Sequence, residues 1–185
     1  MKHAVFLDRD GVLNEPVIRN GKPYPPASPS ELIISDGAQT ALDALRRLGF
    51  ALVCVTNQPD IARGTVLPET VDAINARLMS ALQLDAVFVC PHDDADCCEC
   101  RKPKAGLLLK AAHDLDIDLG SSYLVGDRWR DIEAGAAAHC KTILIDRGYD
   151  ERLSSVPPDA SVSSISEAAA WIAFDRKSVT NKIAM

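Results

Sequence analysis

The chain has 185 residues, a length that suits one domain with a substantial core. Its formal net charge of −6 argues against a broad nucleic-acid surface, which needs clustered excess lysine and arginine. The start, Met1-Lys2-His3 and then only four apolar residues, is too short for a signal peptide, and no window approaches the roughly 18 apolar residues of a membrane-spanning helix. We therefore expect a soluble, cytoplasmic protein that binds neither nucleic acid nor membranes.

The first apolar run, Ala4 to Leu7, predicts a buried strand that leads directly into Asp8-Arg9-Asp10-Gly11. Because side chains alternate along a strand, Asp8 and Asp10 are expected on one side and Arg9 on the other. Two neighbouring carboxylates repel each other unless a cation or a shared proton lies between them. The strand end therefore suggests a divalent-metal site, although a solvated Asp-Gly turn explains this pattern equally well when taken alone.

Residues 15–35 follow as a long loop, because their prolines exclude a regular helix or a central strand. Beyond this loop, short apolar runs alternate with segments of helical periodicity. Strands are predicted at 51–55, 86–90, 123–125 and 142–145, with a short edge strand at 161–164, and helices at 38–48, 68–82, 108–115, 131–138 and 166–174. The pattern indicates an α/β fold, a central parallel sheet with helices on both faces, in a single domain over residues 1–174. Residues 175–185 show no apolar period and are expected to form a flexible tail.

Polar residues stand where three of the predicted strands end. Asp8 and Asp10 follow the first strand, the segment Thr56 to Gln58 follows the second, and Asp127 follows a later one. In open parallel sheets, ligands bind beyond the carboxyl ends of the strands. Three strand ends that carry polar residues therefore predict a functional site at this edge of the sheet.

Four motifs, spread over about Ala4 to Asp146, resemble those of the haloacid dehalogenase (HAD) superfamily. They are Asp8-Arg9-Asp10-Gly11, Thr56-Asn57, Lys102 and Gly126-Asp127-Arg128-Trp129-Arg130-Asp131. Each motif alone is weak, but the four in this order are highly specific. The resemblance implies a Rossmann-like HAD fold and a phosphatase that works through an aspartyl-phosphate. Only loops follow Asn14 and Gln58, so the large cap domain of many HAD phosphatases is expected to be absent.

The resemblance also implies a role for each residue of the phosphate site. Asp8 would be the nucleophile, and Asp10 the general acid and base that protonates the leaving alcohol and then activates water. Asp8, the backbone carbonyl of Asp10 and Asp127 would bind Mg²⁺, which prefers oxygen ligands. Thr56 would hold the phosphoryl oxygens, and Lys102 would neutralise their charge in the transition state.

Substrate contacts are expected from four further residues, Asn57, Gln58, Arg63 and Arg101. Arg63 and Arg101 could hold a second phosphate or sugar hydroxyls, and arginine can bind such an anion with two parallel hydrogen bonds. For Asp131, a role in orienting a metal-bound water stays open. We interpret Lys104 as a solvated residue near a helix start.

Six cysteines in a chain of this kind favour metal binding or catalysis over disulfides. Residues 90–100 hold a Cys-x-His pair and a Cys-x-Cys pair, and a Cys₃His set suits tetrahedral zinc. This loop resembles that of HAD subfamily IIIA, the branch with histidinol-phosphate and heptose-bisphosphate phosphatases, and by resemblance the ligands are Cys90, His92, Cys98 and Cys100. Cys97 could take the place of Cys98 as a ligand. We favour Cys98, because Cys98 and Cys100 form the Cys-x-Cys pair. With four protein ligands the zinc would be structural and would hold the loop so that Arg101 and Lys102 reach the phosphate.

The substrate motifs point in two directions. Ile61 to Gly64 resembles the heptose-bisphosphate branch, whereas the short zinc loop and Gly126-Asp127-Arg128 resemble the histidinol-phosphate branch. We favour D-glycero-D-manno-heptose 1,7-bisphosphate, cleaved at C7, with histidinol phosphate as the alternative and the anomer unspecified. A non-catalytic phosphoacceptor domain and a zinc-stabilised interaction module are alternatives from other classes. We expect a monomer that acts on a small phosphorylated sugar.

Overall fold

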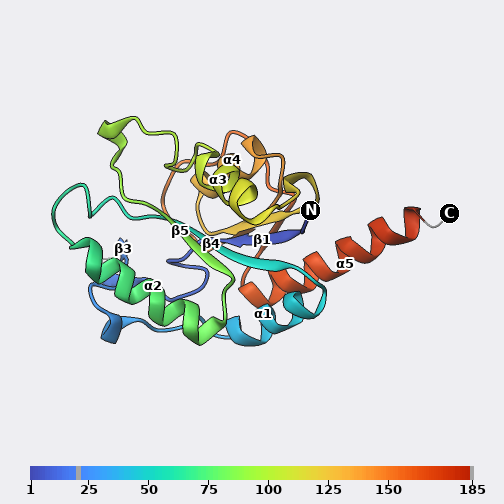
Figure 1. Cartoon of the computed structure of the whole chain (residues 1–185), viewed down its shortest axis with the longest axis horizontal. Helices are drawn as coiled ribbons and strands as arrows, with labels where there is room; N and C mark the ends of the chain where they lie inside the picture. The colour runs from blue at the N-terminus through green and yellow to red at the C-terminus, as the bar shows by residue number, and fades with distance from the viewer. Residues whose placement is uncertain (20–21, 184–185) are drawn as a thin grey trace.

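The structure, a computed structural model, describes residues 1–19 and 22–183 (Figure 1). Its strands are β1 (Ala4–Leu7), β2 (Val17–Arg19), β3 (Lys22–Tyr24), β4 (Ala51–Asn57), β5 (Ala86–Cys90), β6 (Tyr123–Gly126), β7 (Lys141–Ile145) and β8 (Ala160–Val162). Its α-helices are α1 (Ala38–Arg47), α2 (Pro68–Leu82), α3 (Gly106–Leu115), α4 (Trp129–Ala137) and α5 (Ile165–Ile183). Short 3₁₀ helices lie at Pro29–Glu31, Asp94–Asp96 and Leu119–Ser121. Among these described helices, none combines the length and apolar character that a membrane crossing requires.

A six-stranded parallel sheet in the order β5-β4-β1-β6-β7-β8 forms the centre of the fold. Strand β1 lies inside it, and its Phe6 is opposite Val53 of β4 and Leu124 of β6. The strand order changes direction at β1, so the carboxyl ends of β1, β4 and β6 border the crevice in which open α/β sheets bind ligands. The predicted parallel α/β sheet is confirmed.

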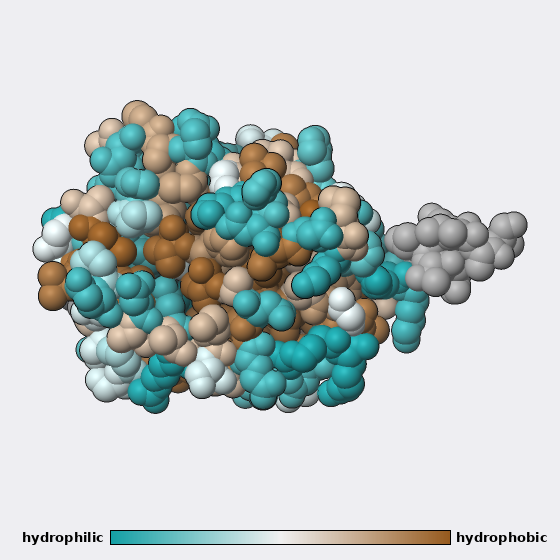
Figure 2. Space-filling model, in the orientation of Figure 1, coloured by the Kyte–Doolittle hydropathy of each residue, from teal (hydrophilic) through white to brown (hydrophobic). Residues whose placement is uncertain are grey.

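Helices cover both faces of the sheet (Figure 1). Val5 and Leu7 of β1 pack into a core with α1, α2 and α5, whereas Ala4 and Phe6 pack into a second core with α3 and α4. All four side chains are fully buried, as a central strand covered on both faces requires. Figure 2 shows an outer face on which hydrophilic side chains are interspersed with smaller hydrophobic areas.

Short segments take the places where a cap domain could be inserted. Between β1 and α1 the described residues form only the β2–β3 hairpin, a 3₁₀ helix and connecting turns. Between β4 and α2 they form only turns. The described part of the chain therefore has a capless arrangement, as expected. The hairpin itself was not predicted, and it lies outside the main sheet, where proline is tolerated.

Helix α5 is longer than the sequence predicts, because it continues past Phe174 to Ile183. Asp175 accepts a hydrogen bond from the Tyr123 hydroxyl at 2.7 Å and one from Lys141 Nζ at 2.6 Å. These contacts hold the helix against the sheet at a point where apolar periodicity has ended. The predicted helix end at Phe174 is therefore wrong. The division into a domain over 1–174 and a tail over 175–185 stays a prediction, and residues 184–185 lie outside the described residues.

Candidate active site

A cavity of about 380 Å³ opens at the carboxyl ends of β1, β4 and β6. Its lining includes Asp8, Asp10, Thr56, Asn57, Gln58, Arg63, Arg101, Lys102 and Asp127. Every residue that the sequence assigned to catalysis, substrate or magnesium thus lies on this one cavity. The strands position Asp8, Thr56 and Asp127, because parallel strands end at the same edge of the sheet, whereas Lys102, Arg63 and Arg101 come from loops.

Lys102 lies at the base of the cavity between two carboxylates. Its Nζ is 2.7 Å from Asp8 Oδ1 and 2.6 Å from Asp131 Oδ1, and it donates a hydrogen bond to the Val55 carbonyl at 2.8 Å. Burial alone would lower the pKa of Lys102, but Asp131 and Asp8 outweigh this effect and raise it. The lysine is therefore held as a cation beside the predicted nucleophile. Asn57 supports it, because the Asn57 amide exchanges hydrogen bonds with the Lys102 backbone at 3.0 and 3.1 Å.

Asp8, Asp127 and Asp131 form a buried acidic group in which one oxygen of each carboxylate lies within 4.8 Å of the other two. One lysine opposes three carboxylates, so their negative charge is incompletely neutralised. Burial raises the pKa of Asp8 to about 6, and burial together with Asp8 and Asp131 raises that of Asp127 well above its usual value. Asp127 Oδ1 is buried and has no hydrogen-bond partner. A divalent cation with oxygen ligands fits both the missing charge and the unpartnered oxygen.

Two glycines allow these carboxylates to approach closely. Gly11 has a φ of 93°, and a Cβ atom there would collide with the Asp127 carboxylate. A Cβ atom at Gly126 would likewise collide with the side chain of Asp131. Glycine adopts a positive φ without steric cost and leaves room for the neighbouring group. At Gly11 and Gly126, the glycines of the two predicted motifs, a larger residue would therefore clash with the acidic side chains.

The raised carboxyl pKa values predict how the stability of the magnesium-free protein depends on pH. Asp8 and Asp127 bind protons more readily in the folded state than in the unfolded chain, so protonation favours folding. Their stabilising effect is complete below about pH 4, the ordinary carboxyl pKa, and is lost as pH rises through about 6 for Asp8. Lowering the pH from about 7 to about 5 should therefore raise the melting temperature, measured calorimetrically in magnesium-free buffer.

The Asp127→Asn variant is the control, and its melting temperature should respond less to pH because one of the two groups no longer titrates. Salt-bridged carboxylates have the opposite effect on stability, which they lose as the pH falls, but they do so at lower pH. Arg152, for example, holds the pKa of Glu133 at about 2. A melting temperature that falls steadily between about pH 7 and about pH 5 would contradict the raised pKa values.

The Asp10 carboxylate is held by three side chains, two from the turn after β1 and one from the end of β4. Arg9 Nη2 donates to Oδ2 at 2.9 Å, Asn14 Nδ2 to Oδ1 at 3.1 Å, and Gln58 Nε2 to Oδ2 at 2.9 Å. Gln58 also donates to Thr56 Oγ1 at 2.9 Å, which links the ends of β1 and β4. Arg9 is absent from the cavity lining, as strand alternation predicts, yet its guanidinium reaches back to Asp10.

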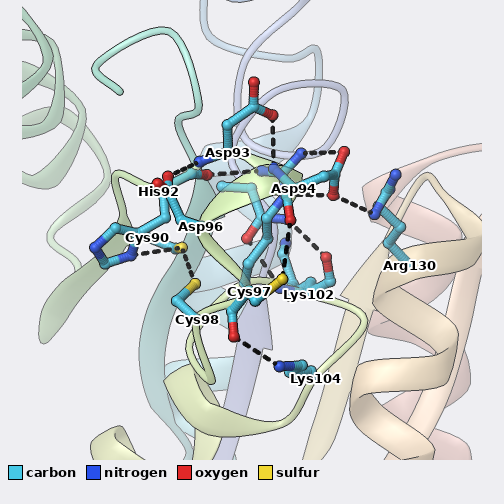
Figure 3. A network of polar contacts seen from close by, with 12 residues as sticks. Cys90, His92, Asp93, Asp94, Asp96, Cys97, Cys98, Lys102, Lys104 and Arg130 are labelled. Atoms are coloured by element: carbon cyan, nitrogen blue, oxygen red, sulfur yellow. Dashed lines mark hydrogen bonds and ion pairs between the residues drawn. The ribbon is translucent and has the colours of Figure 1, made fainter. Parts of the chain in front are cut away.

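Acidic residues after β5 hold the arginines at the cavity rim. Arg63 Nε lies 2.7 Å from Asp93, and Arg101 Nε lies 2.8 Å from Asp94. Asp94 also pairs with Arg130 at 3.2 Å, and Figure 3 shows its carboxylate turned toward this second arginine. The segment after β5 therefore determines where the cations of the rim lie.

Four residues of the same segment form a compact cluster, Cys90, His92, Cys98 and Cys100. The Cys100 sulfur lies 3.1 Å from that of Cys90, 3.5 Å from that of Cys98 and 3.3 Å from His92 Nδ1. These separations are close to what a tetrahedral site with Zn–S bonds of about 2.3 Å requires. The cluster could therefore hold a zinc ion.

The alternative ligand Cys97 lies apart from this cluster (Figure 3). Its backbone is left-handed, with a φ of 49°, and its exposed thiol faces the Asp94 carbonyl at 3.9 Å. Cys98 is turned inward, with its sulfur 3.7 Å from that of Cys90. The geometry therefore favours Cys98 over Cys97.

The loop after β7 supplies residues that sequence reasoning missed. Arg147 Nη2 donates to the Gly11 carbonyl at 2.8 Å, Tyr149 lines the cavity, and Glu151 pairs with Arg128 at 2.6 Å. The three residues alternate along the chain just after a predicted strand. That position beyond a strand end was the signal that could have identified them.

The fold and the site together define a class of protein. A doubly wound parallel sheet carries paired aspartates at the end of β1, a threonine at the end of β4, a buried lysine, and an acidic group after β6. This set of groups on this topology is that of a HAD-like hydrolase.

Comparison with known proteins agrees with this class. A sequence profile of the family described as HAD-hydrolase-like matches residues 99–168. The D-glycero-beta-D-manno-heptose-1,7-bisphosphate 7-phosphatase of Pasteurella multocida is 39% identical over 162 residues, which cover 80% of this chain and 84% of that protein. The Escherichia coli K12 protein of the same name is 35% identical over 182 residues, with 91% and 87% covered.

A solved structure agrees as well. The crystal structure of the D,D-heptose 1,7-bisphosphate phosphatase from B. bronchiseptica, complexed with magnesium and phosphate, matches with a TM-score of 0.76 and 30% identity. The match covers 94% of this chain and 99% of that one. The chain therefore belongs to the HAD superfamily, in the family that contains these heptose-bisphosphate phosphatases, and it is a phosphoric monoester hydrolase.

Proposed function

We propose that the protein is a Mg²⁺-dependent phosphatase that hydrolyses D-glycero-D-manno-heptose 1,7-bisphosphate at C7 through an aspartyl-phosphate. The observation that carries this proposal is the single cavity that joins Asp8, Lys102 and Asp127 at its base to Arg63 and Arg101 at its rim. A bisphosphate needs two sites of positive charge, one for the phosphoryl group that is transferred and one for the group that is retained.

Asp8 is the nucleophile of the first step. A carboxylate oxygen of Asp8 attacks phosphorus, the bond to the C7 oxygen breaks, and the phosphoryl group is carried as a mixed anhydride. Lys102 pairs with Asp8 at 2.7 Å and stabilises the negative charge of the transferred group. Asp8, Asp127 and the backbone carbonyl of Asp10 would hold Mg²⁺, which supplies further positive charge to the phosphoryl oxygens when bound.

Asp10 moves the protons of both steps. It protonates the departing C7 oxygen and then takes a proton from the water that hydrolyses the aspartyl-phosphate. Its hydrogen bond from Gln58, which also reaches Thr56, places it beside the residue expected to hold the phosphoryl oxygens. Asp131 positions Lys102, because one of its oxygens pairs with Nζ and the other accepts the Arg128 backbone N–H at 3.1 Å.

The Cys₃His cluster binds a structural zinc ion in this proposal. Four protein ligands leave no position for a reacting water. The chain between these ligands carries Asp93 and Asp94, which hold Arg63 and Arg101 at the rim. The cluster would therefore affect substrate binding through the loop that it folds, while the reaction takes place in the cavity.

A Mg²⁺-dependent phosphate-release screen tests the substrate. The α and β anomers of D-glycero-D-manno-heptose 1,7-bisphosphate are compared with histidinol phosphate at equal concentrations. We expect kcat/KM for the heptose bisphosphate to exceed that for histidinol phosphate by about 100-fold, because a second charge-assisted contact of about 3 kcal/mol is lost with the monophosphate. The curated relatives are named for the β anomer, so we expect the β anomer to be preferred.

The Arg101→Lys variant is the matched control for this screen, because lysine keeps the charge but loses bidentate binding. In this variant the ratio of kcat/KM for the bisphosphate to that for histidinol phosphate should fall, and turnover of histidinol phosphate should stay nearly unchanged. Comparably low turnover of all three compounds by the unaltered protein would contradict the assigned substrate.

A further inference from the structure

Arg9 is a buried cation outside the catalytic cavity. Its side chain is fully buried, and it is absent from the residues that line the cavity. A buried guanidinium is costly unless its donors are paired. Nη2 donates to Asp10 Oδ2 at 2.9 Å, and Nε lies 3.2 Å from each Asp10 oxygen. One edge of the Arg9 guanidinium, formed by Nε and Nη2, therefore contacts the Asp10 carboxylate.

Asn75 of α2 holds the opposite end of this guanidinium. Arg9 Nη1 donates to Asn75 Oδ1 at 2.9 Å, although the two residues are 66 positions apart in the chain. The other buried residues of α2 are all apolar, namely Val71, Ile74, Leu78 and Leu82. A polar side chain on an apolar helix face lowers stability unless it is hydrogen-bonded, and Asn75 has this bond to Arg9. The pair therefore ties a helix of the scaffold to Asp10.

The side chains that donate hydrogen bonds to Asp10 differ in charge. Asn14 and Gln58 each donate one neutral hydrogen bond, whereas Arg9 supplies the charged contact, from a rigid planar group that is fixed at both ends. Proton transfer requires the carboxylate to lie within hydrogen-bond reach of the leaving oxygen, and small displacements slow such steps strongly. A fixed guanidinium is suited to hold the carboxylate in one orientation.

We propose that Arg9, locked in place by Asn75, is a positioning residue that orients the Asp10 carboxylate for proton transfer. The Arg9 side chain is absent from the cavity lining and bonds to the Asp10 carboxylate, so it acts on the reaction through Asp10. This inference rests on the proposed function, in which Asp10 is the general acid and base.

Two variants test the inference, each assayed with one ester whose leaving group needs a proton and one whose leaving group does not. Arg9→Lys keeps the charge but cannot span Asp10 and Asn75, and Asn75→Ala releases Arg9 while leaving the cation in place. For a sugar phosphate, kcat should fall about 10- to 100-fold with KM nearly unchanged, because departure of an alcohol needs the proton. For p-nitrophenyl phosphate, single-turnover release of p-nitrophenolate should stay within about threefold of the unaltered protein, because this leaving group departs as an anion without a proton.

A double-mutant cycle supplies the second readout. In an Asp10→Asn background, Arg9→Lys should cause no further loss, because its effect is transmitted by Asp10. Arg46→Lys is the matched control. Arg46 bonds to Asp43 and to backbone carbonyls at the end of α2, away from the cavity, so this variant should match the unaltered protein with both esters. Thermal melts of every variant report folding separately.

The outcomes separate the inference from the function on which it rests. Equal losses with both esters, or Asn75→Ala kinetics identical to those of the unaltered protein, would overturn the positioning role while the phosphatase assignment stands. An additive loss in the Asp10→Asn background would overturn it as well. Failure of the unaltered protein to release phosphate from either ester would overturn the proposed function, and the inference with it.

Discussion

Replacement of Asp8 by Asn should reduce phosphate release by on the order of 10³-fold or more, because an amide cannot form the phosphoryl anhydride. The introduced amide has nearly the volume of the carboxylate that it replaces, so the fold should survive. The buried Lys102 would still pair with Asp131, 2.6 Å away. Steady-state phosphate release measures the loss, and acid-quenched protein given a radiolabelled phosphoester should carry covalent label only when Asp8 is present.

The matched control for this variant is Asp116→Asn. Asp116 is an exposed aspartate at the end of α3 with a φ of 55°, a conformation that asparagine also tolerates. It should release phosphate at the rate of the unaltered protein. Turnover by Asp8→Asn near that rate would remove Asp8 as the nucleophile and overturn the aspartyl-phosphate mechanism.

Loss of one cysteine of the Cys₃His cluster should remove zinc and, with it, most of the activity on a bisphosphate. Structural zinc sites contribute roughly 10–16 kcal/mol of apparent binding free energy, and that binding folds the surrounding loop. In Cys98→Ser the loop should loosen, so that Asp93 and Asp94 no longer hold Arg63 and Arg101 at the rim. Elemental analysis should find zinc in the unaltered protein and little in the variant, and KM should rise.

Cys97→Ser is the matched control, because it removes a neighbouring thiol that lies outside the cluster. It should keep one zinc ion and the kinetics of the unaltered protein. Zinc loss in Cys97→Ser but not in Cys98→Ser would assign the ligand to Cys97. Protein purified without chelator that contains no zinc would contradict the zinc site altogether.

The sequence by itself determined the sheet, the capless arrangement and the strand-end residues of the cavity. Short apolar runs are recognisable as buried strands, and parallel strands bring their carboxyl ends to one edge. Asp8, Thr56 and Asp127 each follow such a run, so their convergence could be predicted from local patterns alone. Lys102 has no strand of its own, and its place depended on the resemblance to a known family.

The choice between the two adjacent cysteines needed the three-dimensional structure. In the sequence, a metal-binding loop could use either Cys97 or Cys98 as a ligand. The left-handed backbone at Cys97 turns its thiol outward and leaves Cys98 facing Cys90. The full length of α5 has a similar cause, because Asp175 is held by Tyr123 and Lys141, contacts that periodicity cannot reveal.

Only the tertiary structure decided how Asp10, the proposed general acid and base, is supported. The bond from Arg9 to Asn75 spans 66 positions, and the bond from Arg147 to the Gly11 carbonyl spans 136. Hydrogen bonds between residues so far apart leave no periodic trace, since neither partner needs a particular neighbour in sequence. The sequence therefore predicted which groups gather at the site, and the packing of α2 and of the loop after β7 against the end of β1 decided how those groups are held.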